Sequence, residues 1–379
     1  MQSNRSLQFV CFSFLLSVTV FITSVGAQTA NEFKFINAQN TATMEKELNQ
    51  NAASGWRLFQ FPKSVHSDSM GALLSRPAAT EQAVKYEYKV LATRRIGTLE
   101  QEFKTATSQG YEFRSIVSIY RAGDVAMEYF LNSGGETMIV LERPQGITQP
   151  RFEYQFLSVK LEGTLQKELS KVVAEGYRPL EMVRAVDNSV KRTAVSLIVP
   201  GGSLLMRKEE RTLITIRDLA PATSNTSKLE YKFLATQKVA TMEKEMNDAA
   251  KAGFRFHSSS PGLLTLMSRD PNDKSPKQRY EYKLLATRKT GTMQKEMQDM
   301  GEKGFNYLST SSGLGGITTL FEHDLEKPVG TDKKEYKLLA AFTDSTTEKE
   351  LNGAMNGGFQ FRDITKIGEF IIVLDRPKK

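Results

Sequence analysis

The stretch Thr241-Met242-Glu243-Lys244-Glu245-Met246-Asn247, continued through Ala249-Ala250 to Gly253-Phe254, carries a pattern that occurs six times in this chain. Each copy is counted from an aromatic residue in the strand before it: Phe33, Tyr88, Tyr154, Tyr231, Tyr282 and Tyr336. Ten residues later there is always a threonine: Thr43, Thr98, Thr164, Thr241, Thr292 and Thr346. Fourteen residues later there is always a glutamate: Glu47, Glu102, Glu168, Glu245, Glu296 and Glu350. Twenty-two residues later there is always a glycine, followed by an aromatic residue: Gly55, Gly110, Gly176, Gly253, Gly304 and Gly358. The chain is therefore a tandem repeat.

The repeat divides the chain into six short units after an N-terminal leader. The leader, residues 1–27, reads as a secretory signal peptide because one arginine precedes a long apolar run that ends in small residues, and we expect cleavage between Ala27 and Gln28. An uncleaved membrane anchor is the alternative. The units are residues 31–80, 84–146, 150–219, 228–274, 278–328 and 333–379. Units this small bury little core alone, so we expect neighbours to pack on one another.

Each unit is expected to fold as strand–helix–strand–strand. Alternating apolar residues such as Tyr280, Tyr282 and Leu284 indicate the first strand. The recurring threonine is a good helix N-cap. The helix dipole favours an acid two residues later, such as Glu243. Met242, Met246 and Ala249-Ala250 form one apolar stripe on the helix. The pattern predicts an α+β fold with a small antiparallel sheet in strand order 1-3-2 and one helix on one face of each sheet.

The glycine and the end of the last strand carry further expectations. The glycine supplies the left-handed residue that ends a helix. A basic residue closes each last strand and is expected to meet the final helix carbonyls: Arg76, Arg143, Arg207, Arg269, His323 and Arg376. Insertions are expected at 116–131 in unit two and at 184–196 and 212–219 in unit three.

A second set of apolar residues, three positions after each aromatic residue, should face away from the helix and meet a neighbouring unit. They are Ile36, Leu91, Leu157, Leu234, Leu285 and Leu339. Left in water, each would lose about 1.5–3 kcal/mol of the stabilisation that burial provides.

The last unit resembles a known family. Tyr336-Lys337-Leu338-Leu339, Glu348-Lys349-Glu350-Leu351-Asn352, Gly357-Gly358-Phe359-Gln360-Phe361 and Ile372-Val373-Leu374-Asp375-Arg376-Pro377 are similar to the bacterial domain of unknown function 4177. The resemblance extends over all six units and is weakest in unit three, where Pro179 and Lys208 depart from it. It implies the strand–helix–strand–strand fold and no activity.

No residue set in the sequence indicates a metal, cofactor or catalytic site. The only cysteine, Cys11, lies in the leader, and His66, His257 and His323 match no metal-binding spacing. The recurring glutamate is interpreted as a structural hydrogen bond or ion pair, with six equivalent ligand sites as the alternative. The unit two and three insertions hold Asp124, Glu128, Asp187 and Lys191, which form no recognisable catalytic set.

The charge is mildly basic, with a formal net charge of +8, of which the leader contributes one. Basic residues before equivalent helices are candidate contacts for an anionic ligand: Arg94, Arg95, Lys238, Arg288 and Lys289. We therefore expect a non-catalytic, exported binding or scaffold protein of the bacterial periplasm or cell exterior. Its partner would be an anionic envelope polymer or another envelope protein, with no nucleic acid, no cofactor and no membrane span after leader removal. A protein–protein assembly component is the first alternative, and a secreted enzyme with its site in the insertions of unit two or three is the second.

Overall fold

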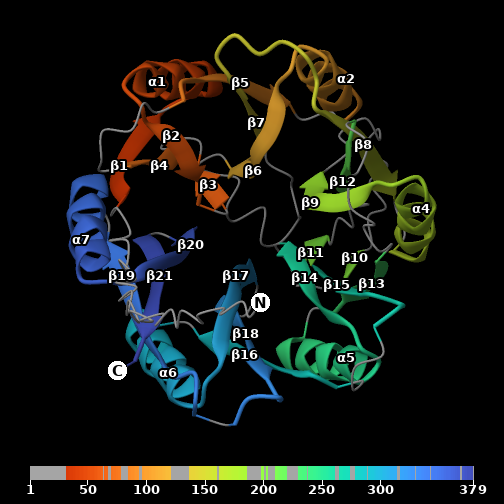
Figure 1. Ribbon diagram of the computed structural model, residues 1–379, viewed down its shortest axis with the longest axis vertical. Coiled ribbons are helices and arrows are strands. Elements are labelled where there is room, and N and C mark those ends of the chain that lie inside the picture. The colour runs from red at the N-terminus through yellow and green to blue at the C-terminus, as the bar shows by residue number, and fades with distance from the viewer. Residues whose placement is uncertain are drawn as a thin grey trace, which may run out of the picture.

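The computed structural model shows the expected repeat closed into a ring, with helices outside and strands inside (Figure 1). The structure describes residues 31–62, 64–66, 70–77, 84–93, 96–120, 136–159, 162–185, 198–199, 202–203, 210–219, 229–236, 238–260, 264–273, 278–287, 289–313, 316–328, 330–341, 343–367 and 369–378. The leader with Ala27 and Gln28, and the four residues named in the insertions, lie outside these ranges. None of the described helices is both long and apolar enough to cross a membrane.

In the part of the chain that the structure describes, each unit contributes one helix. The six helices are α1 (Thr41–Ala53), α2 (Ile96–Thr107), α4 (Glu162–Ala174), α5 (Val239–Lys251), α6 (Thr290–Glu302) and α7 (Asp344–Asn356).

Each unit also holds a small antiparallel sheet in the predicted order 1-3-2. The first strands are β1 (Asn31–Ala38), β5 (Tyr86–Thr93), β8 (Phe152–Val159), β13 (Glu230–Ala235), β16 (Tyr280–Thr287) and β19 (Lys334–Ala341). The second strands are β2 (Arg57–Gln60), β6 (Glu112–Tyr120), β9 (Arg178–Ala185), β14 (Arg255–Ser260), β17 (Asn306–Gly313) and β20 (Gln360–Ile367). The last strands, central in each sheet, are β4 (Met70–Pro77), β7 (Glu136–Pro144), β12 (Glu210–Asp218), β15 (Leu264–Arg269), β18 (Gly316–Asp324) and β21 (Glu369–Pro377).

Three further short strands lie outside this pattern in the described residues. Strand β3 (Ser64–His66) pairs in parallel with β6 of the next unit, so unit two has a four-stranded sheet. Strands β10 (Ile198–Val199) and β11 (Gly202–Ser203) form a separate hairpin in unit three.

Every helix ends two or three residues before the predicted glycine. All six recurring glycines have φ between 81° and 93°, the left-handed region. The aromatic residue that follows donates its backbone N–H five residues back, as Phe254 does to the carbonyl of Ala249 at 3.1 Å. This is the bond of a Schellman cap, so the Gly-aromatic pair stops each helix as expected.

The predicted start of the helices is wrong. The recurring threonine is the third helical residue in every unit, since α5 begins at Val239 and Thr241 follows two positions later. The N-cap residue lies three positions before the threonine, where Asn40 accepts from the N–H of Thr43 and Thr343 accepts from that of Thr346. A threonine inside a first turn can resemble an N-cap in sequence because both positions favour short polar side chains.

The insertion predicted at the end of unit three is also wrong. Residues 212–219 are not an insertion, because residues 210–218 form the last strand, β12. Its closing basic residue is therefore Arg217, opposite Glu153 of β8, and Arg207 lies outside the described residues.

The apolar residues three positions after the aromatic one face the opposite way from the prediction. Leu234 packs with Met242 and Met246 of its own helix, and Ile36 packs with Met44 and Leu48 of α1. The aromatic residue itself faces the preceding unit, as Tyr282 does in the cluster around α5. Both sheet faces are thus covered, one by the unit's own helix and the other by the preceding unit's helix. The expectation that units pack on one another is confirmed, but it is a helix that meets each neighbouring sheet.

Candidate functional site

Polar side chains at two recurring helix positions join one unit to the next. At the junction of units four and five, the amide of Asn247 on α5 donates to the Tyr282 carbonyl at 3.0 Å and accepts from the Tyr282 N–H at 2.9 Å. Glu243, one turn earlier, accepts from the N–H of Leu284 at 3.0 Å. A helix in one unit therefore caps the free edge of the first strand in the next.

The same pair of helix positions, twelve and sixteen residues after the aromatic residue, serves other junctions. Glu45 and Asn49 cap β5, Gln166 caps β13, Gln294 and Gln298 cap β19, and Glu348 and Asn352 cap β1. Three of the acids expected near the start of the helix dipole, Glu45, Glu243 and Glu348, thus accept strand hydrogen bonds. Because a bare strand edge invites pairing with another chain, these side chains also shield the sheets from aggregation.

The recurring glutamate of the sequence pattern lies on the helix flank and is not buried. Glu47, Glu168, Glu245 and Glu296 are half-exposed, and Glu102 and Glu350 are exposed. Glu296 accepts from the hydroxyl of Thr287, and Glu168 pairs with Lys171 at 2.7 Å. These two contacts are local, so the described structure gives the glutamate no common partner across the units.

The closing basic residue makes the predicted contact with the helix end and two more that were not predicted. Arg376 donates to the carbonyl of Gly357 at 2.8 Å, pairs with Glu335 at 2.7 Å, and lies 4.3 Å from the ring centroid of Phe359. Arg143, Arg217 and Arg269 repeat all three contacts, with Tyr111, Tyr177 and Phe254 as the stacked rings. In unit five, buried His323 bonds the carbonyl of Gly304 through Nδ1 at 3.2 Å.

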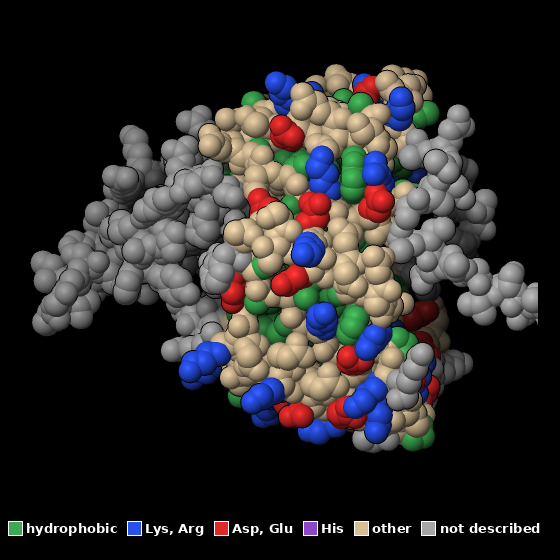
Figure 2. Space-filling model, turned by 90° about the vertical axis from the view of Figure 1, so that its left-hand side faces the viewer, with side chains coloured by type: hydrophobic (Ala, Val, Ile, Leu, Met, Phe, Trp, Pro, Cys, Tyr) green, Lys and Arg blue, Asp and Glu red, His purple; other side chains and the backbone are tan. Residues whose placement is uncertain are grey.

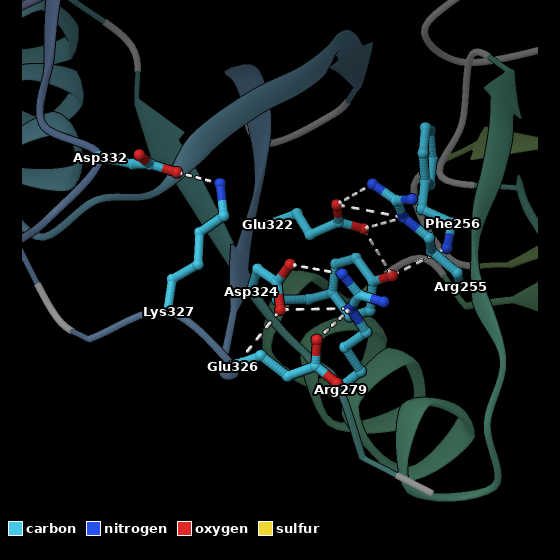
Figure 3. A network of polar contacts seen from close by, with 9 residues as sticks. Arg255, Phe256, Arg279, Glu322, Asp324, Glu326, Lys327 and Asp332 are labelled. Atoms are coloured by element: carbon cyan, nitrogen blue, oxygen red, sulfur yellow. Dashed lines mark hydrogen bonds and ion pairs between the residues drawn. The ribbon is translucent and has the colours of Figure 1, made fainter. Parts of the chain in front are cut away.

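A buried carboxylate at the junction of units four and five looks most like a reactive centre (Figure 3). Glu322, 4% exposed, accepts from Arg255 of the preceding unit at 2.7 Å and from the Tyr282 hydroxyl at 3.0 Å. That hydroxyl accepts in turn from the N–H of Phe256 at 2.8 Å. Next to it, Arg279 pairs with Asp324 and Glu326.

This arrangement is structural because its polar atoms bond one another. Burial and the Glu322 carboxylate raise the pKa of Tyr282 far above its ordinary value, so the phenol keeps its proton and is no ready base or nucleophile. Glu142, Arg57 and Tyr88 repeat the arrangement between units one and two. A second copy at an equivalent junction favours a role in joining units. Among the described residues, no group of three or more His, Cys, Asp or Glu side chains could hold a metal ion.

The candidate anion-binding residues are placed only in part. Arg94, Arg95 and Arg288 lie outside the described residues. Lys238 and Lys289 are the N-cap residues of α5 and α6, are exposed, and make no side-chain cap bond. They occupy equivalent places in adjacent units, so the ring sets them one unit apart on its helix-bearing rim. On the side of the molecule around α7 and β1, basic and acidic side chains are interspersed (Figure 2).

The comparisons with known proteins add no assignment. No protein-family model matches the chain, and no curated protein sequence matches it significantly. The resemblance of the repeat to domain of unknown function 4177 stays a prediction from its residues.

The strand-capping amides were missed in the sequence, although a signal was present. Asn or Gln recurs two positions after the conspicuous glutamate, as at Asn49, Asn247, Gln298 and Asn352. It passed unnoticed because an exposed amide on a helix predicts nothing until its neighbour is known.

Proposed function

We propose that this chain is an exported, non-catalytic ring scaffold of the bacterial cell envelope that binds an anionic polymer through the first turns of its helices. The observation that carries the proposal is that Lys238 and Lys289 occupy the N-cap positions of neighbouring helices. Both are exposed, and neither side chain bonds the first turn of its helix. The first N–H groups of a helix have no partner within the helix and carry partial positive charge. Phosphate or carboxylate groups along the partner would accept hydrogen bonds from the free N–H groups at both helix starts.

The rest of the structure is consistent with a scaffold. Four of the arginines that close the strands are each occupied by a ring, a carboxylate and a helix carbonyl within their own unit: Arg143, Arg217, Arg269 and Arg376. The capping amides are occupied by strand edges. Residues that repeat in most units therefore build the ring, which leaves residues at the helix starts to contact a partner. Weak equivalent contacts on a rigid ring add up against a repetitive polymer.

The experiment measures binding of the mature chain to polyphosphate and to polyglutamate at low and high salt. Exposed charges are screened over about 8 Å at physiological ionic strength, so affinity should fall steeply as salt rises. Replacing Arg94, Arg95, Lys238, Arg288 and Lys289 with Ser should reduce affinity at least tenfold. The matched control replaces five exposed lysines in the second turns of the helices: Lys46, Lys167, Lys244, Lys295 and Lys349.

The control removes the same number of charges and should keep most of the affinity. Equal losses in both variants would reduce the effect to net charge and reject the helix-start site. Salt-independent binding, or none to either polymer, would reject the proposal and favour a protein–protein assembly component.

A further inference from the structure

Within the described residues, the junction between units two and three lacks the helix-to-strand-edge hydrogen bonds that join the other units. Glu100 and Lys104 stand on α2 where the other helices carry their capping side chains. Within the described residues, neither bonds the edge of β8 at Tyr154 or Phe156. An ammonium can only donate, so Lys104 cannot repeat the two-way bond that Asn247 makes with the backbone of Tyr282.

The described strands on the inner side of the same junction also lack a contact found elsewhere. Second strands of neighbouring units contact one another from β9 through β14, β17 and β20 to β3, and β3 pairs with β6. In the described part of the chain, β6 and β9 make no comparable contact. Among the described residues, five junctions are thus joined on the inside by strand contacts, and the one between units two and three has no such contact.

The ion pair found at two other junctions is also missing here. Arg57 and Arg255 reach across to Glu142 and Glu322, but the equivalent residue of unit two is the acid Glu112. The residue of unit three that replaces the carboxylate is Ile216, opposite Tyr154. Burial raises the pKa of Glu112, which is the sign of a carboxyl group without sufficient compensation.

The described residues at this junction are joined by apolar contact, by one hydrogen bond and by a covalent tether, residues 145–151 between β7 and β8. Phe103 lies edge-on to Tyr154 and Phe156, each at 5.1 Å between centroids, and the Tyr154 hydroxyl accepts from the Phe113 N–H at 3.0 Å. Tyr154 is half-buried, whereas Tyr282 is fully buried at its own junction. The tether packs on the end of α2, because a Cβ at Gly110 would lie 2.9 Å from the carbonyl carbon of Thr148.

We propose that the ring opens at the junction between units two and three, by rotation about the tether after Thr148, while the other five junctions stay closed. Opening separates Phe103 from the rings of Tyr154 and Phe156 and frees the edge of β8. The inference is independent of the polymer-binding proposal, because it concerns only contacts between units. It assigns the movement to the absence of any cap from α2, on which Lys104 stands at the position of Asn247.

The test measures distances between spin labels on pairs of equivalent helix positions, by pulsed electron paramagnetic resonance. The full chain with Cys11→Ser offers no other cysteine, so labels attach only where cysteine is introduced. One pair, Gln101→Cys with Lys167→Cys, spans the junction in question. The matched control pair, Lys244→Cys with Lys295→Cys, spans units four and five from the same repeat positions, all four of which are exposed.

We expect a narrow distribution for the control pair and an added long-distance component for the pair across units two and three. Lys104→Asn restores the capping amide and should reduce that component roughly two- to tenfold, the effect of one net hydrogen bond. Lys104→Ala removes the charge without supplying the amide and should leave the component in place. A narrow distribution in the parent chain, an equal long component in the control pair, or equal closure by Ala and Asn would each overturn the proposal.

Discussion

The side chain of Asn352 closes the ring on the backbone of Phe33, 319 residues earlier in the chain. Its Nδ2 donates to the Phe33 carbonyl at 2.9 Å, and its Oδ1 accepts from the Phe33 N–H at 2.9 Å. Asn49 and Asn247 make the same pair of bonds at junctions where the chain is continuous. The first and last units are thus joined by the same hydrogen bonds as units one and two and units four and five, although no linker runs between them.

Asn352→Ala should weaken this closure. Two hydrogen bonds are lost, and the partly buried N–H and C=O of Phe33 lose their partners, so the free energy of unfolding should fall by about 1–3 kcal/mol. Urea denaturation followed by circular dichroism measures the change. The control is Asn356→Ala, at an exposed position on the same helix, which should change stability by no more than about 0.5 kcal/mol. Equal effects of the two variants would show that the amide does not hold the ring closed.

The repeat pattern was enough to predict the local fold but not the way units meet. The glycine at 253 predicts a left-handed helix end because few other residues adopt that backbone, so the physical reason lies within a few residues. The partner of Asn247 lies 35 residues away on a neighbouring sheet. Nothing local distinguishes such an amide from a solvated one. The sheet face on which Leu234 lies was predicted wrongly for a related reason. Helices cover both faces of the sheet, and the sequence does not show which of the two helices belongs to the same unit.

The helix-ending glycines should tolerate substitution unequally. Gly253 has φ +85° and free space where a Cβ would lie, so Gly253→Val costs only backbone strain, about 1–2 kcal/mol of stability. Gly110→Val should cost more, because its Cβ would also meet the backbone of Thr148 at 2.9 Å. Thermal unfolding compares both with Ala252→Ser, which should change little. If Gly253→Val unfolds at the same temperature as Ala252→Ser, the proposed helix end is wrong.

The stacked arginine should not be replaceable by lysine. Arg269 lies 4.7 Å from the centroid of Phe254, pairs with Glu230 at 2.6 Å and donates to the carbonyl of Ala252 at 3.0 Å. One ammonium cannot make all three contacts, so Arg269→Lys should lower stability by about 0.5–1.5 kcal/mol although the charge is kept. Lys244→Arg, the reverse exchange at an exposed helix position, is the control in the same denaturation assay. Indistinguishable curves would reduce the contact to an ordinary surface ion pair.

The buried tyrosines should make the ring sensitive to alkali. Burial is the main cause that raises the pKa of Tyr154, to about 12, and it raises those of Tyr88, Tyr282, Tyr307 and Tyr336 in the same direction. The folded chain therefore binds more protons than the unfolded one above the ordinary tyrosine pKa of about 10. Linkage makes this contribution to stability complete below that pH, and it is lost as pH rises through the folded-state values. A titration of tyrosinate absorbance should lag behind the same titration in urea and should rise together with loss of circular dichroism. Tyr154→Phe, which places at β8 the residue type that β1 already has at Phe33, should remove one of the late-titrating groups. Tyrosines that all ionise near the ordinary value in the folded chain would contradict their burial at the junctions.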